Sequence, residues 1–225
     1  MRIAACNVRH SRQLILFPQP LRSLAMLQSE HNGAYSANQC TRRADHTPNT
    51  AQEEDNNYIL ALHTDPEHHA RVTALRNQYF PPKLNKLDAH VALFRALPGS
   101  QLSLIEANIL ELARKQQSFS ISTGKPFMMA HGVGLGAQAP QSREIYIALK
   151  GKWEGFLSKQ DMSFQPHYTV QNKAEKGTPE KTLEAIEREW QGSRGQVDGL
   201  TLWRYDRGYW RHTRDFMFGS TFDEG

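Results

Sequence analysis

Two short apolar segments that each begin with a histidine constrain this chain more than any other feature. They cover residues 90–93 (His-Val-Ala-Leu) and 167–170 (His-Tyr-Thr-Val), and their histidines are 77 residues apart. Side chains alternate between the two faces of a strand, so the residue two positions after each histidine shares its face. This separation is too long for local structure. It suits two halves of one domain, whose strands would bring both histidines to one cleft.

A pair of histidines in one cleft is suited to proton transfer. Histidine titrates near neutral pH, so one imidazole can accept a proton while the other donates one, without a metal ion. The hydroxyl of Thr169 would lie beside His167 and could hold a phosphate oxygen, whereas Ala92 occupies the equivalent position beside His90. The alternative is structural, because the chain has ten histidines and a strand histidine can simply be partly buried and hydrogen-bonded. Thr169 is in any case a residue that favours strands.

Apolar periodicity and helix-start signals predict the elements around the first histidine. Residues 58–62 form an apolar run typical of a buried strand. The Asp-Pro-Glu sequence at 65–67 supplies an N-cap, a proline at the first helical position and an acidic first turn. A strand is predicted over 90–97, and a capping box at 103–106 predicts the start of the next helix.

The second half of the chain predicts a similar succession. Strands are predicted over 119–130, 144–149 and 164–171. The glycine-rich stretch 132–136 is interpreted as a turn or a bulged strand, because no helix start is recognised after it. A helix is predicted to begin with Thr-Pro-Glu at 178–180. The alternating pattern over 200–218, interrupted by Asp-Arg-Gly at 206–208, predicts a hairpin.

This order predicts an α+β fold in which two antiparallel sheets face each other across a central cleft, with helices on the outside. Each histidine strand precedes a helix, so the two halves look like duplicated units. We expect the domain to cover residues 57–225. Residues 1–56 are expected to be a disordered or targeting extension, because they are first arginine-rich without acidic residues and then rich in polar residues.

Composition restricts the class of protein further. The net charge of +4 is modest and spread along the chain, unlike the concentrated patch of a dedicated nucleic-acid binder. Both cysteines, Cys6 and Cys40, precede the predicted domain, which indicates a reducing compartment. No apolar run reaches the length of about 18 residues that spans a membrane. We therefore expect a cytoplasmic protein, or a mitochondrial one if the arginine-rich start is a transit peptide.

The histidine segments and their flanks resemble the 2H phosphoesterases, the superfamily of 2′-5′ RNA ligases and cyclic phosphodiesterases. Its members carry two His-x-Thr/Ser-x tetrapeptides in one chain. The extended stretches 90–100 (HVALFRALPGS) and 202–210 (LWRYDRGYW) look like fungal-type members in particular. The resemblance covers residues 57–219.

This resemblance implies a bilobal fold and a metal-independent phosphodiesterase. The substrate would be a 2′,3′-cyclic phosphate or a related RNA or nucleotide phosphodiester. His90 and His167 would act as acid and base, in an order that the sequence leaves open, and Thr169 would bind a phosphate oxygen. The resemblance also implies that the protein needs no cofactor and no metal ion. It implies a monomer that does not bind membranes and whose substrate is an RNA end or a cyclic nucleotide.

One position departs from the superfamily pattern, since Ala92 stands where threonine or serine is expected. A hydrogen bond to a charged group contributes about 1.5–3 kcal/mol, so its loss can lower a rate by roughly one to two orders of magnitude. A catalytically weak or inactive module that binds RNA or a nucleotide phosphate therefore stays open as an alternative. A metal-dependent hydrolase fits poorly, because His68 and His69 are adjacent on a predicted helix and cannot both face one metal ion.

Overall fold

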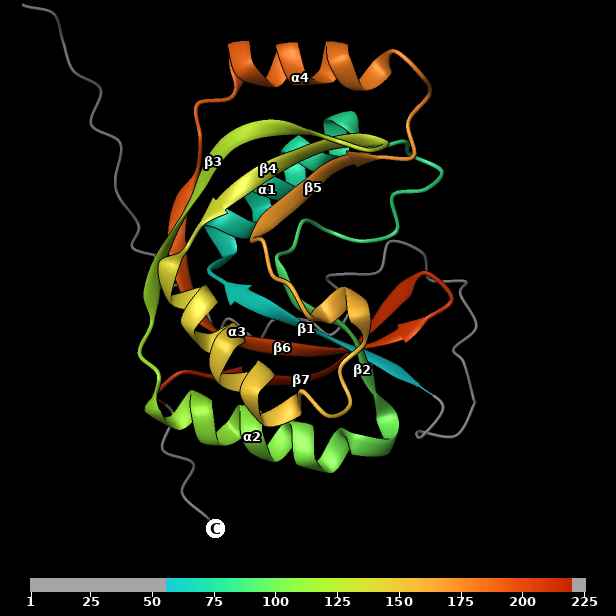
Figure 1. Cartoon of the computed structure of the whole chain (residues 1–225). Coiled ribbons are helices and arrows are strands. Elements are labelled where there is room, and N and C mark those ends of the chain that lie inside the picture. The colour runs from blue at the N-terminus through green and yellow to red at the C-terminus, as the bar shows by residue number, and fades with distance from the viewer. Residues whose placement is uncertain (1–55, 220–225) are drawn as a thin grey trace, which may run out of the picture. The chain divides into compact units, whose positions relative to one another are not determined.

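Two successive β-α-β-α-β units make up the described part of the chain, residues 56–219 of the computed structural model (Figure 1). The first unit consists of β1 (Asn57–Thr64), α1 (Pro66–Tyr79), β2 (Ala92–Pro98), α2 (Leu102–Lys115) and β3 (Phe119–Met129). The second consists of β4 (Gly132–Gln138), α3 (Pro140–Trp153), β5 (His167–Asn172), α4 (Thr178–Glu189) and β6 (Arg194–Asp206), followed by β7 (Tyr209–Met217). Two 3₁₀ turns, η2 (Gly99–Gln101) and η3 (Lys159–Asp161), precede α2 and β5. Each histidine segment thus lies at the start of the second strand of its unit.

The third strand of each unit joins the sheet of the other unit. Hydrogen bonding gives the strand order β2-β1-β6-β3-β4-β5, with β7 also paired to β6, and these pairings are antiparallel. Strand β6 therefore lies beside β1, and β3 lies beside β4. The predicted α+β fold with two antiparallel sheets is confirmed, and the pairing of β3 with β6 joins these sheets into one hydrogen-bonded order.

Strand β6 connects the two halves because it is long enough to serve both. Its residues 197–204 pair with β1, and on its other edge residues 194–197 pair with β3 and residues 199–206 with β7. The sequence indicated a strand only from residue 200. The first part of β6 was not predicted, because residues 194–196 (Arg-Gly-Gln) are polar and do not alternate with apolar residues.

The first helix of each unit packs against the histidine strand of the other unit: α1 against β5, and α3 against β2. Helix α1 contacts β5 and β6, α4 contacts β3 and β4, and α2 contacts β6, β7 and α3 (Figure 1). From α3, the rings of Tyr146 and Trp153 lie 5.2 and 4.9 Å from that of Phe94 in β2. From α1, a ring nitrogen of His68 lies 2.8 Å from the hydroxyl of Tyr168 in β5. The position of each histidine strand consequently depends on both units.

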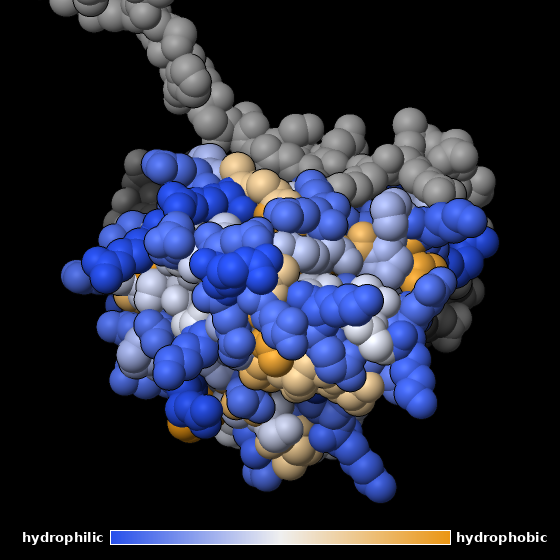
Figure 2. Space-filling view, turned by 90° about the horizontal axis from the view of Figure 1, so that it is seen from above, coloured by the Kyte–Doolittle hydropathy of each residue, from blue (hydrophilic) through white to orange (hydrophobic). Residues whose placement is uncertain are grey.

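Helix α4 covers one end of the β3-β4-β5 sheet and presents a polar surface. It buries Pro179, Thr182 and Ile186, while its charged side chains face solvent. Figure 2 looks down on this side and shows a mainly hydrophilic face with smaller hydrophobic groups between the polar ones. No helix within residues 56–219 is long and apolar enough to cross a membrane.

The predicted strand over 144–149 is wrong, because these residues belong to α3. Pro140 does not interrupt this region but occupies the first helical position, where its missing N–H costs nothing. The buried residues recur at the spacing of a helix face, and they are Ser142, Ile145, Tyr146, Leu149 and Trp153. Without a side-chain cap before Pro140, the helix start was hidden, and the short apolar run Ile-Tyr-Ile-Ala-Leu was mistaken for a strand.

The predicted capping box at 103–106 is also wrong, since α2 begins at Leu102 directly after the turn η2 and has no side-chain cap. The glycine-rich stretch 132–136 forms the strand β4, which confirms the strand interpretation. The register between β4 and β5 shifts between Val133 and Gly134, but the extra residue lies in β5, between Thr169 and Gln171, so the bulge belongs to the neighbouring strand. Close packing explains two of its glycines, Gly132 and Gly134. A Cβ on Gly132 would lie 2.0 Å from the backbone oxygen of Gln171 in the neighbouring β5.

Two turn and cap predictions are confirmed in detail. Asp65 is the N-cap of α1, and its carboxylate accepts a hydrogen bond of 2.9 Å from the backbone N–H of His68. The hairpin between β6 and β7 turns through Arg207 and Gly208, whose φ angles of 49° and 91° suit a two-residue loop. The proposed extension, residues 1–56, lies outside the described residues except for Asn56, and stays a prediction.

Candidate functional site

A cavity of about 400 Å³ brings the two histidine segments together. His90 and Ala92 reach it from β2 and the residues just before that strand, and His167 and Thr169 reach it from β5. These strands are the two ends of the hydrogen-bonded order. The other lining residues are Leu93, Arg95, Met129, Ser163, Phe164, Gln165, Asn172 and Trp210.

The two histidines are held in the same way. The Nδ1 atom of His90 lies 2.8 Å from the carbonyl oxygen of Asp88, and that of His167 lies 2.8 Å from the carbonyl oxygen of Gln165. A carbonyl oxygen can only accept, so Nδ1 is the protonated, donating nitrogen in both rings. The tautomer and orientation of each ring are thereby fixed by the residue two positions earlier. The second nitrogen, Nε2, is the one that either ring can offer to a substrate.

His90 packs on an aromatic ring and lies in surroundings that lower its pKa. Its ring centroid lies 4.1 Å from that of Trp210. Burial is the main cause that lowers the pKa of His90 to about 3, and the positive charge of Arg76 lowers it further, against the opposing effect of the Asp88 carbonyl. His90 is therefore neutral at pH 7, with an unprotonated Nε2 that can accept a proton.

Around the second histidine, side chains alternate as the sequence predicts. His167 and Thr169 face the cavity, and the ring of His167 meets that of Phe127 edge-on at 5.9 Å. Tyr168 points the other way and is buried, and its hydroxyl shares a hydrogen bond of 2.8 Å with His68. Burial raises the pKa of Tyr168, so it remains a neutral anchor for the strand.

Sequence reasoning missed Arg76, a buried arginine that ties the two histidine segments together. Its Nη1 donates to the carbonyl oxygen of Thr169 at 2.5 Å, and its Nε donates to the carbonyl oxygen of Leu87 at 3.0 Å. One contact fixes the second segment and the other fixes the loop that leads to the first. A signal was present, because Arg76 lies four residues after the buried Val72 and so on the core-facing side of α1.

The remaining described histidines do not gather into a metal site. His68 is buried and shared between Tyr168 and Ser193, and burial lowers its pKa. His63 pairs with Asp198. Among residues 56–219 no group of three or more His, Cys, Asp or Glu side chains is placed to hold a metal ion.

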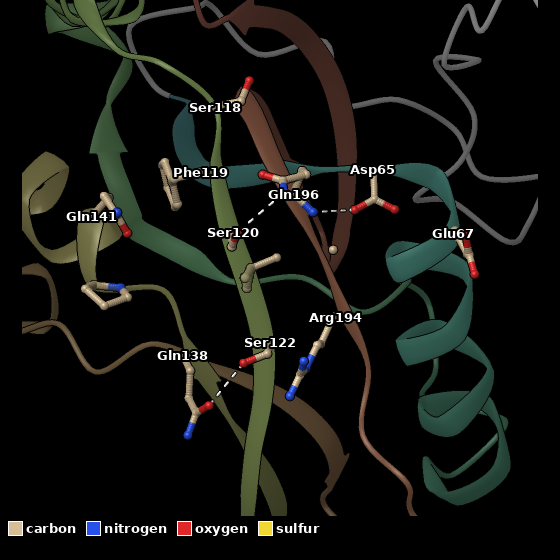
Figure 3. A pocket seen from close by; sticks show the side chains of 13 residues that line it. Asp65, Glu67, Ser118, Phe119, Ser120, Ser122, Gln138, Gln141, Arg194 and Gln196 are labelled. Atoms are coloured by element: carbon tan, nitrogen blue, oxygen red, sulfur yellow. Dashed lines mark hydrogen bonds between the residues drawn. The ribbon is translucent and has the colours of Figure 1, made fainter.

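A second hollow, of about 1020 Å³, lies where β3 and β6 pair, between the first turns of α1 and α3 (Figure 3). It shares no lining residue with the histidine cavity. Its polar groups largely bond to one another. The backbone N–H of Gln196 donates to Asp65 at 2.6 Å, and Ser122 donates to Gln138 at 3.0 Å. No histidine is among the described residues that line this hollow, so it differs from the histidine cavity in the groups that it offers.

Comparison with known proteins places this geometry in context. Residues 64–209 match the family described as the 2′-5′ RNA ligase superfamily, and this range contains both histidine segments. No curated protein sequence matches the chain.

Solved structures of the same fold show the extent of the similarity. The Escherichia coli LigT structure complexed with 3′-AMP superposes with a TM-score of 0.55 at 16% identity, covering 74% of this chain and 100% of LigT. TT0787 of Thermus thermophilus gives a TM-score of 0.52 at 17% identity, covering 73% of this chain and 99% of TT0787. A structure described as a phosphoesterase gives 0.54 at 16% identity, covering 74% and 100% of the two chains. At these identities the similarity establishes the fold.

Proposed function

The chain belongs to the 2′-5′ RNA ligase superfamily, and from that membership we propose that it is a metal-independent phosphodiesterase. The proposed substrate is a 2′,3′-cyclic phosphate or a related RNA or nucleotide phosphodiester. LigT, which shares the fold, has been crystallised with 3′-AMP and with NADP⁺, and this supports a nucleotide phosphate as the ligand class.

The observation that carries this proposal is the matched pair of histidines in one cavity. In both rings Nδ1 donates to a backbone carbonyl oxygen, so Nε2 is the nitrogen that can contact a substrate. A general base and a general acid need this arrangement, because each must exchange a proton with an oxygen on opposite sides of one phosphorus atom. Thr169 lies in the same lining and can donate its hydroxyl to a non-bridging oxygen.

We assign the base to His90, because its burial and the charge of Arg76 keep it neutral. Its Nε2 takes a proton from the attacking water as the water oxygen bonds to phosphorus. The bond from phosphorus to one ribose oxygen breaks, and that oxygen receives the proton of Nε2 of His167. The product is a phosphomonoester, and each histidine ends in the protonation state that the other had at the start.

Alanine substitutions at His90 and His167 test this assignment. We expect each to lower kcat/KM on 2′,3′-cyclic AMP by about 100-fold or more, the typical contribution of general acid–base catalysis. The exposed His131, in the turn between β3 and β4, supplies the control, and His131→Ala should retain full activity. Turnover should also survive excess EDTA. Loss of activity on chelation, with recovery on adding zinc or magnesium, would refute the metal-independent mechanism.

Ala92 favours one second candidate, a module that binds a nucleotide phosphate with little or no turnover. This candidate predicts that 3′-AMP binds in the cavity and that His90→Ala weakens its binding. No product would form from 2′,3′-cyclic AMP, even at high protein concentration. Measuring binding and turnover on the same preparation separates the two candidates.

A further inference from the structure

Two irregularities in β2 change which side chains face the cavity. Ala92 pairs with Ala61 of β1, Phe94 pairs with Leu60, and Leu97 pairs with Tyr58. One extra residue of β2 is therefore accommodated between Ala92 and Phe94, and another between Phe94 and Leu97. Because Leu60 and Ala61 face opposite sides of the sheet, Ala92 and Phe94 do so too, although they are two residues apart.

The consequence falls on Arg95. Strict alternation from His90 would place Arg95 on the side opposite to the cavity. In the structure, Phe94 takes the core position, packed on Tyr146 and Trp153, and Arg95 lines the cavity together with Ala92. A β-bulge is a known means of re-aiming a side chain beside an active site.

A buried carboxylate holds this irregular stretch in place. Asp161 in the turn η3 is 1% exposed, and its two oxygens accept hydrogen bonds from the backbone N–H groups of Arg95 at 2.7 Å and of Ala96 at 2.9 Å. In a regular strand, consecutive backbone N–H groups point to opposite edges. Those of Arg95 and Ala96 point the same way because the strand is irregular here. Asp161 also accepts from the hydroxyl of Ser158 at 3.1 Å, so its charge is well satisfied.

The side chain of Arg95 is suited to bind an anion. Its Nη2 donates to the carbonyl oxygen of Gln160 at 2.6 Å, and its Nε lies 3.9 Å from Asp161. Both partners belong to the turn η3, which the chain leaves to form the cavity wall at 163–165. The side chain is 51% exposed. Of the twelve residues that line the cavity, Arg95 alone carries a permanent charge.

We propose that Arg95 is a phosphate-binding residue that takes over the role of the hydroxyl missing at Ala92. This inference rests on the proposed function and names a substrate-contacting group for it. The guanidinium has five N–H donors, of which one on Nη2 binds the Gln160 carbonyl while Nε lies near Asp161, so the other Nη donors can reach a non-bridging phosphate oxygen from the Ala92 side of the cavity. Thr169 would hold the phosphate from the other side.

A double-mutant cycle on positions 92 and 95 tests the replacement directly. Arg95→Gln in the natural chain should lower kcat/KM on 2′,3′-cyclic AMP by about 10- to 100-fold, the effect of one charged hydrogen bond. Ala92→Thr alone should change it by less than about threefold, since the site is already complete. In the Ala92→Thr background, Arg95→Gln should cost less than about fivefold, because the new hydroxyl compensates. Arg95→Lys, which keeps the charge but not the fork of donors, should fall between the natural chain and Arg95→Gln.

Equal losses from Arg95→Gln in the two backgrounds would overturn the proposal, and so would no loss in either. The affinity for inorganic phosphate and for 3′-AMP, measured by calorimetry, gives a readout that does not require turnover. A protein that binds 3′-AMP without hydrolysing the cyclic nucleotide would refute the proposed function, yet a weaker Kd in Arg95→Gln, restored by Ala92→Thr, would still support the role of Arg95. Thermal unfolding of each variant checks that the fold is retained.

Discussion

At the scale of single residues, His90 links the cavity to the stability of the whole fold. Its pKa is about 3 in the folded protein because of burial and of the charge of Arg76, and the charges of His167 and His69 act in the same direction. The unfolded chain binds a proton at the ordinary pKa of 6.5. Unfolding between these two pH values therefore takes up a proton. The stability that comes from a neutral His90 is complete above about pH 6.5 and is lost as the pH falls towards 3.

We expect the free energy of unfolding, measured in urea at about pH 7, 6 and 5, to decrease with acidification. His68 and His69, whose pKa values are also lowered by burial, contribute to the same slope. His90→Gln removes one titrating group and can still donate to the Asp88 carbonyl, so its pH dependence should be shallower than that of the natural chain. His131→Gln, at an exposed turn, should leave the slope unchanged. Parallel slopes for the natural chain and His90→Gln would contradict the assignment of a neutral His90.

At the scale of elements, β4 and β5 approach each other most closely at Gly132, which lies opposite Asn172 of the strand that begins with His167. The Cα of Gly132 packs so closely on β5 that an added Cβ would lie 2.0 Å from a backbone oxygen, which cannot rotate away. In the same strand Gly136 has its nearest neighbour at 3.5 Å, an ordinary contact. Gly132→Ala should therefore destabilise the fold by about 2 kcal/mol or more, as expected of overpacking against backbone. Gly136→Ala should stay within about 1 kcal/mol of the natural chain.

Urea midpoints of the two glycine variants, with equal m-values, provide this comparison. Gly132→Ala should also lower turnover on 2′,3′-cyclic AMP in the fraction that remains folded, because β5 must move away from β4. If both variants unfold at the same urea concentration as the natural chain, the close approach of β4 to β5 is not as tight as described.

The elements also show how far sequence reasoning reaches. The starts of α1 and the β6–β7 hairpin were predictable, because Asp65-Pro66 and Arg207-Gly208 encode their own local geometry. His167 and Thr169 were predictable as neighbours, because they are two residues apart in β5 and both line the cavity. His90 was predicted to share this cavity from its matching segment, and it lines the same cavity. The helical state of 144–149 was not, since it depends on packing of Tyr146 and Trp153 against Phe94, a residue of the other unit.

The place of Arg95 in the candidate site could not be predicted from the sequence pattern. Its place in the cavity results from two extra residues accommodated in β2 and from a carboxylate 66 residues further along the chain. Arg76 was missed for a related reason, because its partners come from the loop before His90 and from β5. The bulges leave no signal in local periodicity, and the helical spacing of Arg76 from Val72 indicates a core-facing side chain but not its long-range partners.

At the scale of the whole described molecule, the exchange of third strands makes the two units depend on each other. Unit one supplies β3 to the sheet of β4 and β5, and unit two supplies β6 to the sheet of β1 and β2. Cutting the chain at the turn between β3 and β4, after Ala130, would separate β3 from both of its partners and would leave β6 paired with β7 alone. Helices α1 and α2 would then lose the strands β5, β6 and β7 that they contact, and α4 would lose β3.

We therefore expect residues 56–130 and 131–219, prepared separately, to lack a cooperative thermal transition by circular dichroism. An equimolar mixture should recover one, with turnover on 2′,3′-cyclic AMP if the uncut chain is active. The uncut chain at the same concentration is the reference. A cooperative transition in either half alone would show that the exchanged strands are dispensable.

The order of strands has one more consequence. His90 and His167 lie at the starts of β2 and β5, the two ends of the hydrogen-bonded order, and yet they border one cavity. A phosphate bound by both histidines would connect β2 to β5 and so link the two ends of the strand order through the ligand. Ligand binding should therefore slow the exchange of amide hydrogens with deuterium most strongly in β2 and β5, because these terminal strands open most readily in the ligand-free protein.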